Sequence, residues 1–179
     1  MILGLDISTS VVGICLLDID AAVIKNSHID LRKVTDFYEM LDLVEAELST
    51  YPEPNAVFVE EPVMSFSKGK SSALSIATLQ AFNGAVRYIA WNKWGKPVSL
   101  VSARSARSKL KIDTKLPKGL SAYHKKKQLK EKIISWCIEQ DVDLGFEKTK
   151  QDNWQVWCGD RADAYVVARY GIYIDRRMD

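Results

Sequence analysis

The sequence predicts an α/β protein with a mixed five-stranded sheet, in which parallel strands extend an antiparallel meander and helices cover both faces. Three runs rich in apolar and β-branched residues, at 2–6, 11–18 and 22–29, are separated by short turns, which is typical of a meander. Two further apolar runs, at 56–59 and 97–101, alternate with segments of helical periodicity. Because strands that alternate with helices pair in parallel through right-handed crossovers, we expect the fourth strand to lie beside the first.

Five segments have the periodicity or composition of helices: residues 34–48, 73–94, 102–110, 122–140 and 160–174. Two prolines follow the first of these segments and end it, and Ser102 stands where it can cap the third. Residues 112–121 read as a basic loop and residues 141–153 as a polar connection. Neither an internal repeat nor a linker divides the chain, so we expect one domain over residues 1–179.

The charge of the chain is unevenly distributed along the sequence. The formal net charge is only +2 over 179 residues, but residues 100–132 contain 11 basic and two acidic side chains. The flanking regions are mildly acidic. A basic stripe of this kind is typical of a protein that binds a phosphate backbone, although a solvated, lysine-rich helix and loop would give the same count.

Other bulk features exclude some classes of protein. No run of 18 apolar residues is present, so we expect no membrane-spanning helix and no membrane partner. The chain opens directly on a strand-like run, without the pattern of a secretory signal. Three cysteines, Cys15, Cys137 and Cys158, have no metal-binding spacing and are interpreted as buried thiols in a reducing compartment. We therefore expect a cytoplasmic protein.

Four acidic residues are expected to meet at one edge of the sheet. Asp6 and Glu60 each end an apolar strand, and Asp160 and Asp163 are three residues apart, on one face of the last helix. Converging carboxylates repel one another unless a cation lies between them, and oxygen ligands favour Mg²⁺, for which Mn²⁺ can substitute. Two ions about 4 Å apart would suit phosphodiester hydrolysis. Taken singly, each acid could instead be a turn, loop or helix-capping residue.

Several runs, in order along the chain, together resemble the RuvC-type Holliday junction resolvases of the ribonuclease H-like nuclease superfamily. They are ILGLDISTSVVGICLLD (2–18), VFVEEP (57–62), SSALSIATLQAFNGAVRYIA (71–90), SARSARSKLKI (102–112) and GDRADAYVVARYG (159–171). Ile7 and Ser8 stand where the family usually has Pro-Gly, and the loop before the fourth helix is longer and more basic. These departures suit a divergent, phage-type member, acting in the cytoplasm of a bacterium or of a phage-infected host.

The resemblance implies a ribonuclease H-like fold and a structure-selective DNA endonuclease that resolves four-way junctions. Two Mg²⁺ ions would serve hydrolysis that leaves 5′-phosphate and 3′-hydroxyl ends. Asp6 would bridge both ions, Glu60 and Asp163 would hold one, and Asp160 would hold the other or its waters. The resemblance points to Glu60 rather than Glu61 as the ligand.

The resemblance also implies DNA contacts and a second copy of the chain. Phe66 would be an aromatic wedge that stacks on bases of the junction, with a phenyl ring folded onto the core as the alternative. The basic residues expected to contact DNA are Lys68, Lys70, Arg104, Arg107, Lys109, Lys111, Lys126 and Lys127. The helix at 73–94 would form the interface of a homodimer, in which Gly84 allows close approach of two helices.

Three alternatives remain open at this point. Another ribonuclease H-like nuclease, acting on RNA–DNA hybrids or on flap DNA, would use nearly the same acids. The run LDISTS also resembles the first hairpin of sugar kinases and actin-like ATPases, but those proteins repeat the fold in two lobes. A non-catalytic DNA-binding module could keep the fold, although retention of all four acids argues against it.

Overall fold

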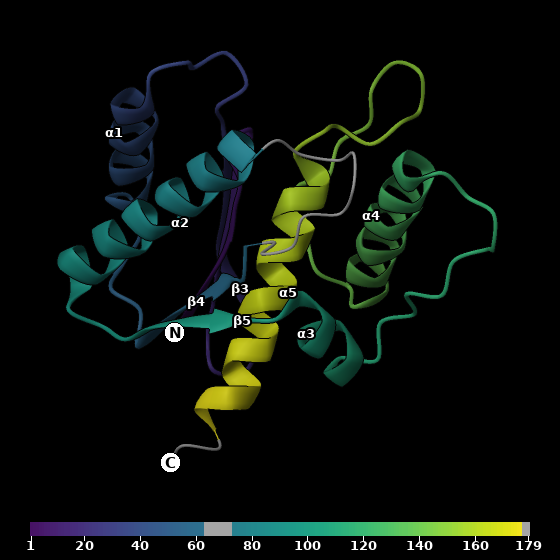
Figure 1. The fold of residues 1–179 in the computed structure, drawn as a ribbon. Helices are drawn as coiled ribbons and strands as arrows, with labels where there is room; N and C mark the ends of the chain where they lie inside the picture. The colour runs from purple at the N-terminus through teal and green to yellow at the C-terminus, as the bar shows by residue number, and fades with distance from the viewer. Residues whose placement is uncertain (63–72, 177–179) are drawn as a thin grey trace.

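The computed structural model describes residues 1–62 and 73–176 (Figure 1). The elements, in chain order, are β1 (Ile2–Ile7), β2 (Val11–Leu17), β3 (Val23–Asp30), α1 (Phe37–Leu48), β4 (Ala56–Glu60), α2 (Ala73–Trp94), β5 (Val98–Val101), α3 (Ala103–Lys109), α4 (Ala122–Glu139) and α5 (Cys158–Asp175). Phe66, Lys68 and Lys70, predicted to contact DNA, lie outside the described residues.

The predicted sheet class is confirmed. The strand order is β3-β2-β1-β4-β5, and β2 pairs antiparallel with both β1 and β3. The strands β1, β4 and β5 pair in parallel. The first strand therefore lies at the centre of the sheet, between its antiparallel and parallel parts, where both of its faces are covered.

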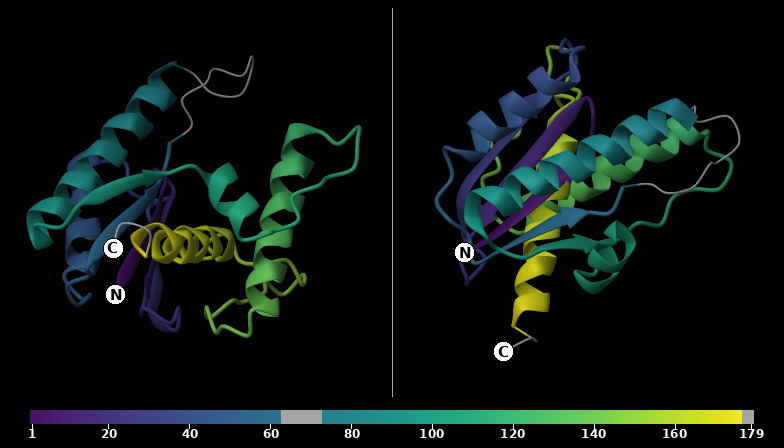
Figure 2. Two further views of the ribbon diagram at one scale, coloured as in Figure 1. Left: turned by 90° about the horizontal axis from the view of Figure 1, so that it is seen from below. Right: turned by 60° about the vertical axis from the view of Figure 1, so that its left-hand side comes forward.

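Helices cover both faces of the sheet, as expected. In Figure 2 α1 and α2 lie on one side of the strands, and α5 lies on the other with α3 and α4 beyond it. The alternation of side chains along each strand separates two apolar clusters. Leu3 and Leu5 pack with α1 and α2, whereas Ile2 and Phe58 pack with α5 and α4.

Two glycines allow the backbone of α5 to lie directly on β1 and β2. A Cβ atom on Gly4 would be 2.4 Å from the carbonyl oxygen of Ala164, and one on Gly13 would be 2.1 Å from that of Asp160. Backbone atoms at such distances leave no room for any side chain. The sheet therefore fixes the position of the first turns of α5 by direct contact.

Three local expectations need correction. Helix α1 begins at Phe37, three residues later than predicted, because the Asp36 side chain caps it by accepting from the backbone N–H groups of Tyr38 and Glu39. Ser102 stands at the N-cap of α3 but its side chain makes no capping hydrogen bond. The connection at 141–153 is not uniformly polar, since Leu144 is buried.

None of the helices among the described residues is long and apolar enough to cross a membrane.

Candidate active site

The four predicted acids line one pocket of about 560 Å³. Asp6 lies on β1 opposite Gly13 of β2, and Leu5 pairs with Val59 of β4. The next residues along these two parallel strands, Asp6 and Glu60, are therefore neighbours on the face that α5 covers. The strand pairing alone brings two carboxylates together.

Helix α5 supplies the other two acids of the pocket. It begins at Cys158, so Asp160 lies in its first turn and does not cap it, and Asp163 follows on the same face. Their exposed fractions are 7% and 6%. The capping role weighed for Asp160 is therefore wrong, because Trp157 occupies the N-cap position.

An aromatic stack anchors the start of α5 on the edge strand β3. The rings of His28 and Trp157 stack with their centroids 4.4 Å apart and an interplanar angle of 9°. The Arg161 guanidinium lies 4.4 Å from the Trp157 ring, and its Nε donates to Nδ1 of His28 at 3.1 Å. Together with the close contact at Gly13, this stack positions the turn that carries Asp160.

Burial, with the neighbouring charges, raises the pKa values of three of these carboxylates. Burial and then the charge of Glu60 raise the pKa of Asp6 well above its ordinary value. Burial and then Asp163 raise the pKa of Glu60 to about 7, and burial raises that of Asp160. An acid cluster with raised pKa values binds cations strongly once it is ionised, because each added positive charge relieves the repulsion.

Two basic side chains already lie among these acids. Nη2 of Arg107, from α3, is 2.8 Å from Oδ1 of Asp163 and 3.9 Å from Oε2 of Glu60. Nζ of Lys130, from α4, donates to Oδ1 of Asp160 at 2.9 Å. Burial acts to lower the pKa of both cations, but the neighbouring carboxylates raise it above the ordinary value in each.

The donor set fits hard divalent cations. Four carboxylates from three elements supply oxygen ligands alone, which is the chemistry that Mg²⁺ and Mn²⁺ prefer. Their side chains are nevertheless not in a ready metal-binding arrangement, since no group of three acidic, His or Cys residues in 1–62 and 73–176 has that geometry. The ion pairs with Arg107 and Lys130 hold three of the four carboxylates instead.

The two consecutive glutamates after β4 differ in their surroundings. Glu60 follows the alternation of Ala56 and Phe58 toward α5 and reaches Arg107, whereas Glu61 is exposed. Both side chains line the pocket. The alternation places Glu60 on the same face of the sheet as Asp6, and the choice of Glu60 over Glu61 as a metal ligand stays a prediction.

The predicted DNA-contacting residues fall into separate groups. Arg107 is only 16% exposed and belongs to the acid pocket. Arg104 and Lys111 line an adjoining hollow of about 670 Å³, which shares Arg107 and Leu129 with the acid pocket. This hollow provides a basic path that leads away from the acids.

The remaining predicted basic residues lie on α3 and α4. Lys126 is exposed and lines the acid pocket. Nζ of Lys127 donates to Oδ1 of Asn153 at 3.2 Å, and Nζ of Lys109 lies 3.9 Å from the centroid of the Tyr173 ring. The structure therefore brings Lys126, but neither of the other two, to the acids.

Sequence reasoning missed two cations of the pocket, Lys130 and Arg32. Lys130 follows Lys126 by four residues, a spacing that puts both on one face of α4, and this signal could have found it. Arg32 has no comparable signal, because it follows β3 in an irregular segment and pairs with Asp30.

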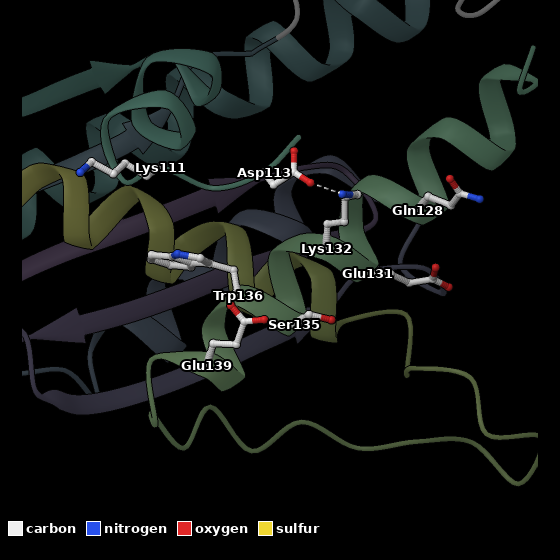
Figure 3. Close-up of a pocket in the computed structure, with 8 residues that line it drawn as sticks. All are labelled: Lys111, Asp113, Gln128, Glu131, Lys132, Ser135, Trp136 and Glu139. Carbon is white, nitrogen blue, oxygen red and sulfur yellow. Dashed lines mark hydrogen bonds and ion pairs between the residues drawn. The ribbon is translucent and has the colours of Figure 1, made fainter. Parts of the chain in front are cut away.

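A second hollow, of about 500 Å³, lies between α4 and the segment at 111–113 (Figure 3). Lys132 reaches across it to Asp113, with Nζ and Oδ2 2.5 Å apart. Its other lining residues are Lys111, Gln128, Glu131, Ser135, Trp136 and Glu139. Acidic and basic side chains meet here too, but at the surface of the protein.

Neither a protein-family model nor a curated protein sequence matches the chain. Solved structures do match it over nearly its whole length. The RuvC of Thermus thermophilus in complex with Holliday junction substrate has a TM-score of 0.60 at 16% identity, covering 98% of this chain and 94% of that chain. The chain has the fold of RuvC. Its fold is therefore ribonuclease H-like, as the resemblance implied.

Two further solved structures have the same fold. A second RuvC structure from Thermus thermophilus has a TM-score of 0.59 at 16% identity, covering 98% of this chain and 96% of that chain. The yeast mitochondrial Holliday junction resolvase Ydc2 has a TM-score of 0.52 at 16% identity, covering 99% and 82%. The likeness in fold spans nearly the whole chain, whereas the activity has to be argued from the residues of its own pocket.

Proposed function

We propose that this protein is a metal-dependent DNA endonuclease that cleaves four-way junctions. The observation that carries the proposal is the convergence of Asp6, Glu60, Asp160 and Asp163 in one pocket beside a basic hollow. Carboxylates of this kind suit phosphodiester hydrolysis, and the hollow suits a phosphate backbone. The structures with the same fold include RuvC with a Holliday junction substrate, which supports this choice of DNA.

Asp6, Glu60, Asp160 and Asp163 would together hold two Mg²⁺ ions. When bound, the ions would supply an activated water and neutralisation of the charge that develops on the phosphate. The chain itself supplies placement, because β1, β4 and α5 fix the four carboxylates on a rigid base. We expect 5′-phosphate and 3′-hydroxyl ends, and Mn²⁺ in place of Mg²⁺ should support cleavage.

Among the residues that the structure describes, Arg107 is the one best placed to meet the phosphate that is cut. It lies between the acid pocket and the basic hollow, and its Nε is buried without a hydrogen-bond partner among the described residues. A guanidinium can serve a carboxylate and a phosphate at once, since it has five N–H donors. Arg104 and Lys111 would hold the backbone farther along the strand.

We also propose that the protein acts as a homodimer through α2. Leu74, Tyr88 and Trp91 on this helix are 77%, 62% and 52% exposed, and a Cβ atom on Gly84 would meet no atom nearer than 4.0 Å. A two-fold dimer would present two acid pockets for paired nicks in opposite strands. Sedimentation that shows a monomer at micromolar concentration would remove this part of the proposal. The three cysteines are free and buried, which suits a cytoplasmic setting.

The proposal is tested with a synthetic four-way DNA junction and Mg²⁺. We compare the wild type, Asp6→Asn and, as a matched control, Asp20→Asn in the exposed turn between β2 and β3. Paired symmetric nicks from the wild type and the control, with binding but no cleavage by Asp6→Asn, are the expected result.

Other results would select the alternatives. Cleavage of an RNA–DNA hybrid or a flap in preference to the junction would keep the nuclease and change its substrate. Junction binding without any cleavage by the wild type would indicate a non-catalytic DNA-binding module. Absence of both binding and cleavage would reopen the ATPase alternative.

A further inference from the structure

Lys130 is the one cation of the pocket that reaches in from α4 to a predicted metal ligand, among the residues that the structure describes. Its ammonium lies 2.9 Å from Oδ1 of Asp160, and 29% of its side chain is exposed. The stem passes so close to Gly159 that a Cβ atom there would be 2.5 Å from Cδ of Lys130. The absence of a side chain at Gly159 thus leaves the space through which the Lys130 side chain reaches Asp160.

A metal ion at Asp160 and the ammonium of Lys130 compete for one carboxylate. The ammonium occupies Oδ1 of Asp160, and a divalent cation at the same oxygen would be repelled by a positive charge only a few ångströms away. The ammonium must therefore move before the metal binds. A phosphate that enters the pocket would give it a new partner, because a lysine binds phosphate as a flexible point charge.

We propose that Lys130 is a positioning residue that occupies the metal position at Asp160 until DNA binds, and then transfers to a DNA phosphate. The inference rests on the proposed function and adds a coupling to it. Lys130 lowers the affinity of the free protein for metal, and DNA restores that affinity by drawing the ammonium away. Metal and DNA then bind with positive coupling, and each raises the affinity for the other by the same factor.

Lys126 provides a matched control. It lies one turn before Lys130 on the same face of α4 and lines the same pocket. Unlike Lys130 it is exposed, and within residues 1–62 and 73–176 no ion pair joins it to an acid. Removal of either lysine deletes one positive charge near Asp160, but only Lys130 blocks the carboxylate.

The first test is a titration of the DNA-free protein with Mn²⁺, followed by calorimetry and by the electron paramagnetic resonance signal of free Mn²⁺. We expect Lys130→Met to bind Mn²⁺ several-fold more tightly than the wild type, while Lys130→Arg and Lys126→Met stay close to it. Methionine keeps the apolar stem that packs at Gly159, so the fold should be retained, and thermal unfolding checks this. Equal or weaker binding by a folded Lys130→Met, or no Mn²⁺ binding by any form at millimolar concentration, would overturn the proposal.

The second test measures the coupling itself. The dissociation constant for a four-way junction is measured with EDTA and with Ca²⁺, which also takes oxygen ligands. The wild type should bind the junction more tightly with Ca²⁺, and this ratio should fall several-fold in Lys130→Met but not in Lys126→Met. An unchanged ratio would contradict the transfer of Lys130 to phosphate. The Mn²⁺ titration needs neither DNA nor turnover, so a failure of the proposed junction cleavage would be seen separately.

Discussion

The acid pocket and the hollow of Figure 3, which α4 lines with different side chains, have similar volumes and similar kinds of lining residue. They differ in how deeply these residues are buried. In the acid pocket Asp160 is 7% exposed, and burial raises its pKa although Lys130 contacts it. In the hollow of Figure 3 Asp113 is exposed, and its hydrogen bond from Lys132 lowers its pKa. A mixture of acids and lysines therefore does not mark a site. The acid pocket is instead distinguished by carboxylates that are both buried and close together, which is typical of functional sites.

The same substitution in both hollows should give the largest difference. Glu60→Gln removes an oxygen ligand and the ion pair with Arg107, so junction cleavage should fall at least about a hundredfold, since a metal contributes several kcal/mol to such a reaction. Glu131→Gln, in the hollow of Figure 3, should cleave like the wild type. Initial rates of nicking at saturating Mg²⁺ decide between them, and equal losses would mean that burial does not distinguish the two hollows.

A change in packing should give the next largest effect. Gly13→Ala would bring a Cβ atom to 2.1 Å from the carbonyl oxygen of Asp160, and α5 would have to move because the atoms that the Cβ meets are backbone atoms. Overpacking of this kind costs about 1–3 kcal/mol, which for a chain of this size lowers the unfolding temperature by about 2–4 °C per kcal/mol. Ser135→Ala, at an exposed position of α4, should stay within about 0.5 kcal/mol of the wild type. Calorimetry measures both, and a Gly13→Ala protein as stable as the wild type would show that the contact is not tight.

The smallest of the expected effects concerns how the stability of the metal-free protein depends on pH. The pKa of Glu60 is raised from 4.5 to about 7 in the fold, so between these values the folded state binds more protons than the unfolded state. The contribution of Glu60 to stability is therefore fully present below pH 4.5 and is lost as pH rises through 7. In EDTA, the unfolding temperature of the wild type should fall more steeply over this range than that of Glu60→Gln.

Asp113→Asn is the control for that measurement. The pKa of Asp113 is lowered below 3.8, so its contribution is present above that value and is lost only as pH falls further. The substitution should therefore leave the slope between pH 4.5 and 7 unchanged. A slope altered by Asp113→Asn but not by Glu60→Gln would reverse the contrast between the two hollows.

The features that the sequence predicts well are those set by short-range periodicity. Alternation along β1 and β4 places Asp6 and Glu60 on one face, and a right-handed crossover makes their strands neighbours. Spacing of three places Asp160 and Asp163 on one face of a helix. The edge of the sheet and its four acids therefore follow from local pattern.

Features that depend on how one helix lies across another could not be predicted in this way. Helical spacing puts Lys126 and Lys130 on one face of α4, but only the placement of α4 against α5 decides that Lys130, rather than Lys126, forms the ion pair with Asp160. Likewise, the sequence places Arg107 in a basic segment, whereas the orientation of α3 turns it into the acid pocket. Ser102 has the composition of a cap but not the geometry of one.

The close contact of β1 and β2 with α5 also sets when the pocket can form during synthesis. Asp160 and Asp163 follow Asp6 by more than 150 residues, so they leave the ribosome well after it. Until α5 docks on Gly4 and Gly13, the nascent chain holds only half of the acids and an uncovered apolar sheet face. The acid pocket is therefore completed only when α5 has been made, so a chain released before α5 would lack two of the four acids on which the proposed cleavage depends.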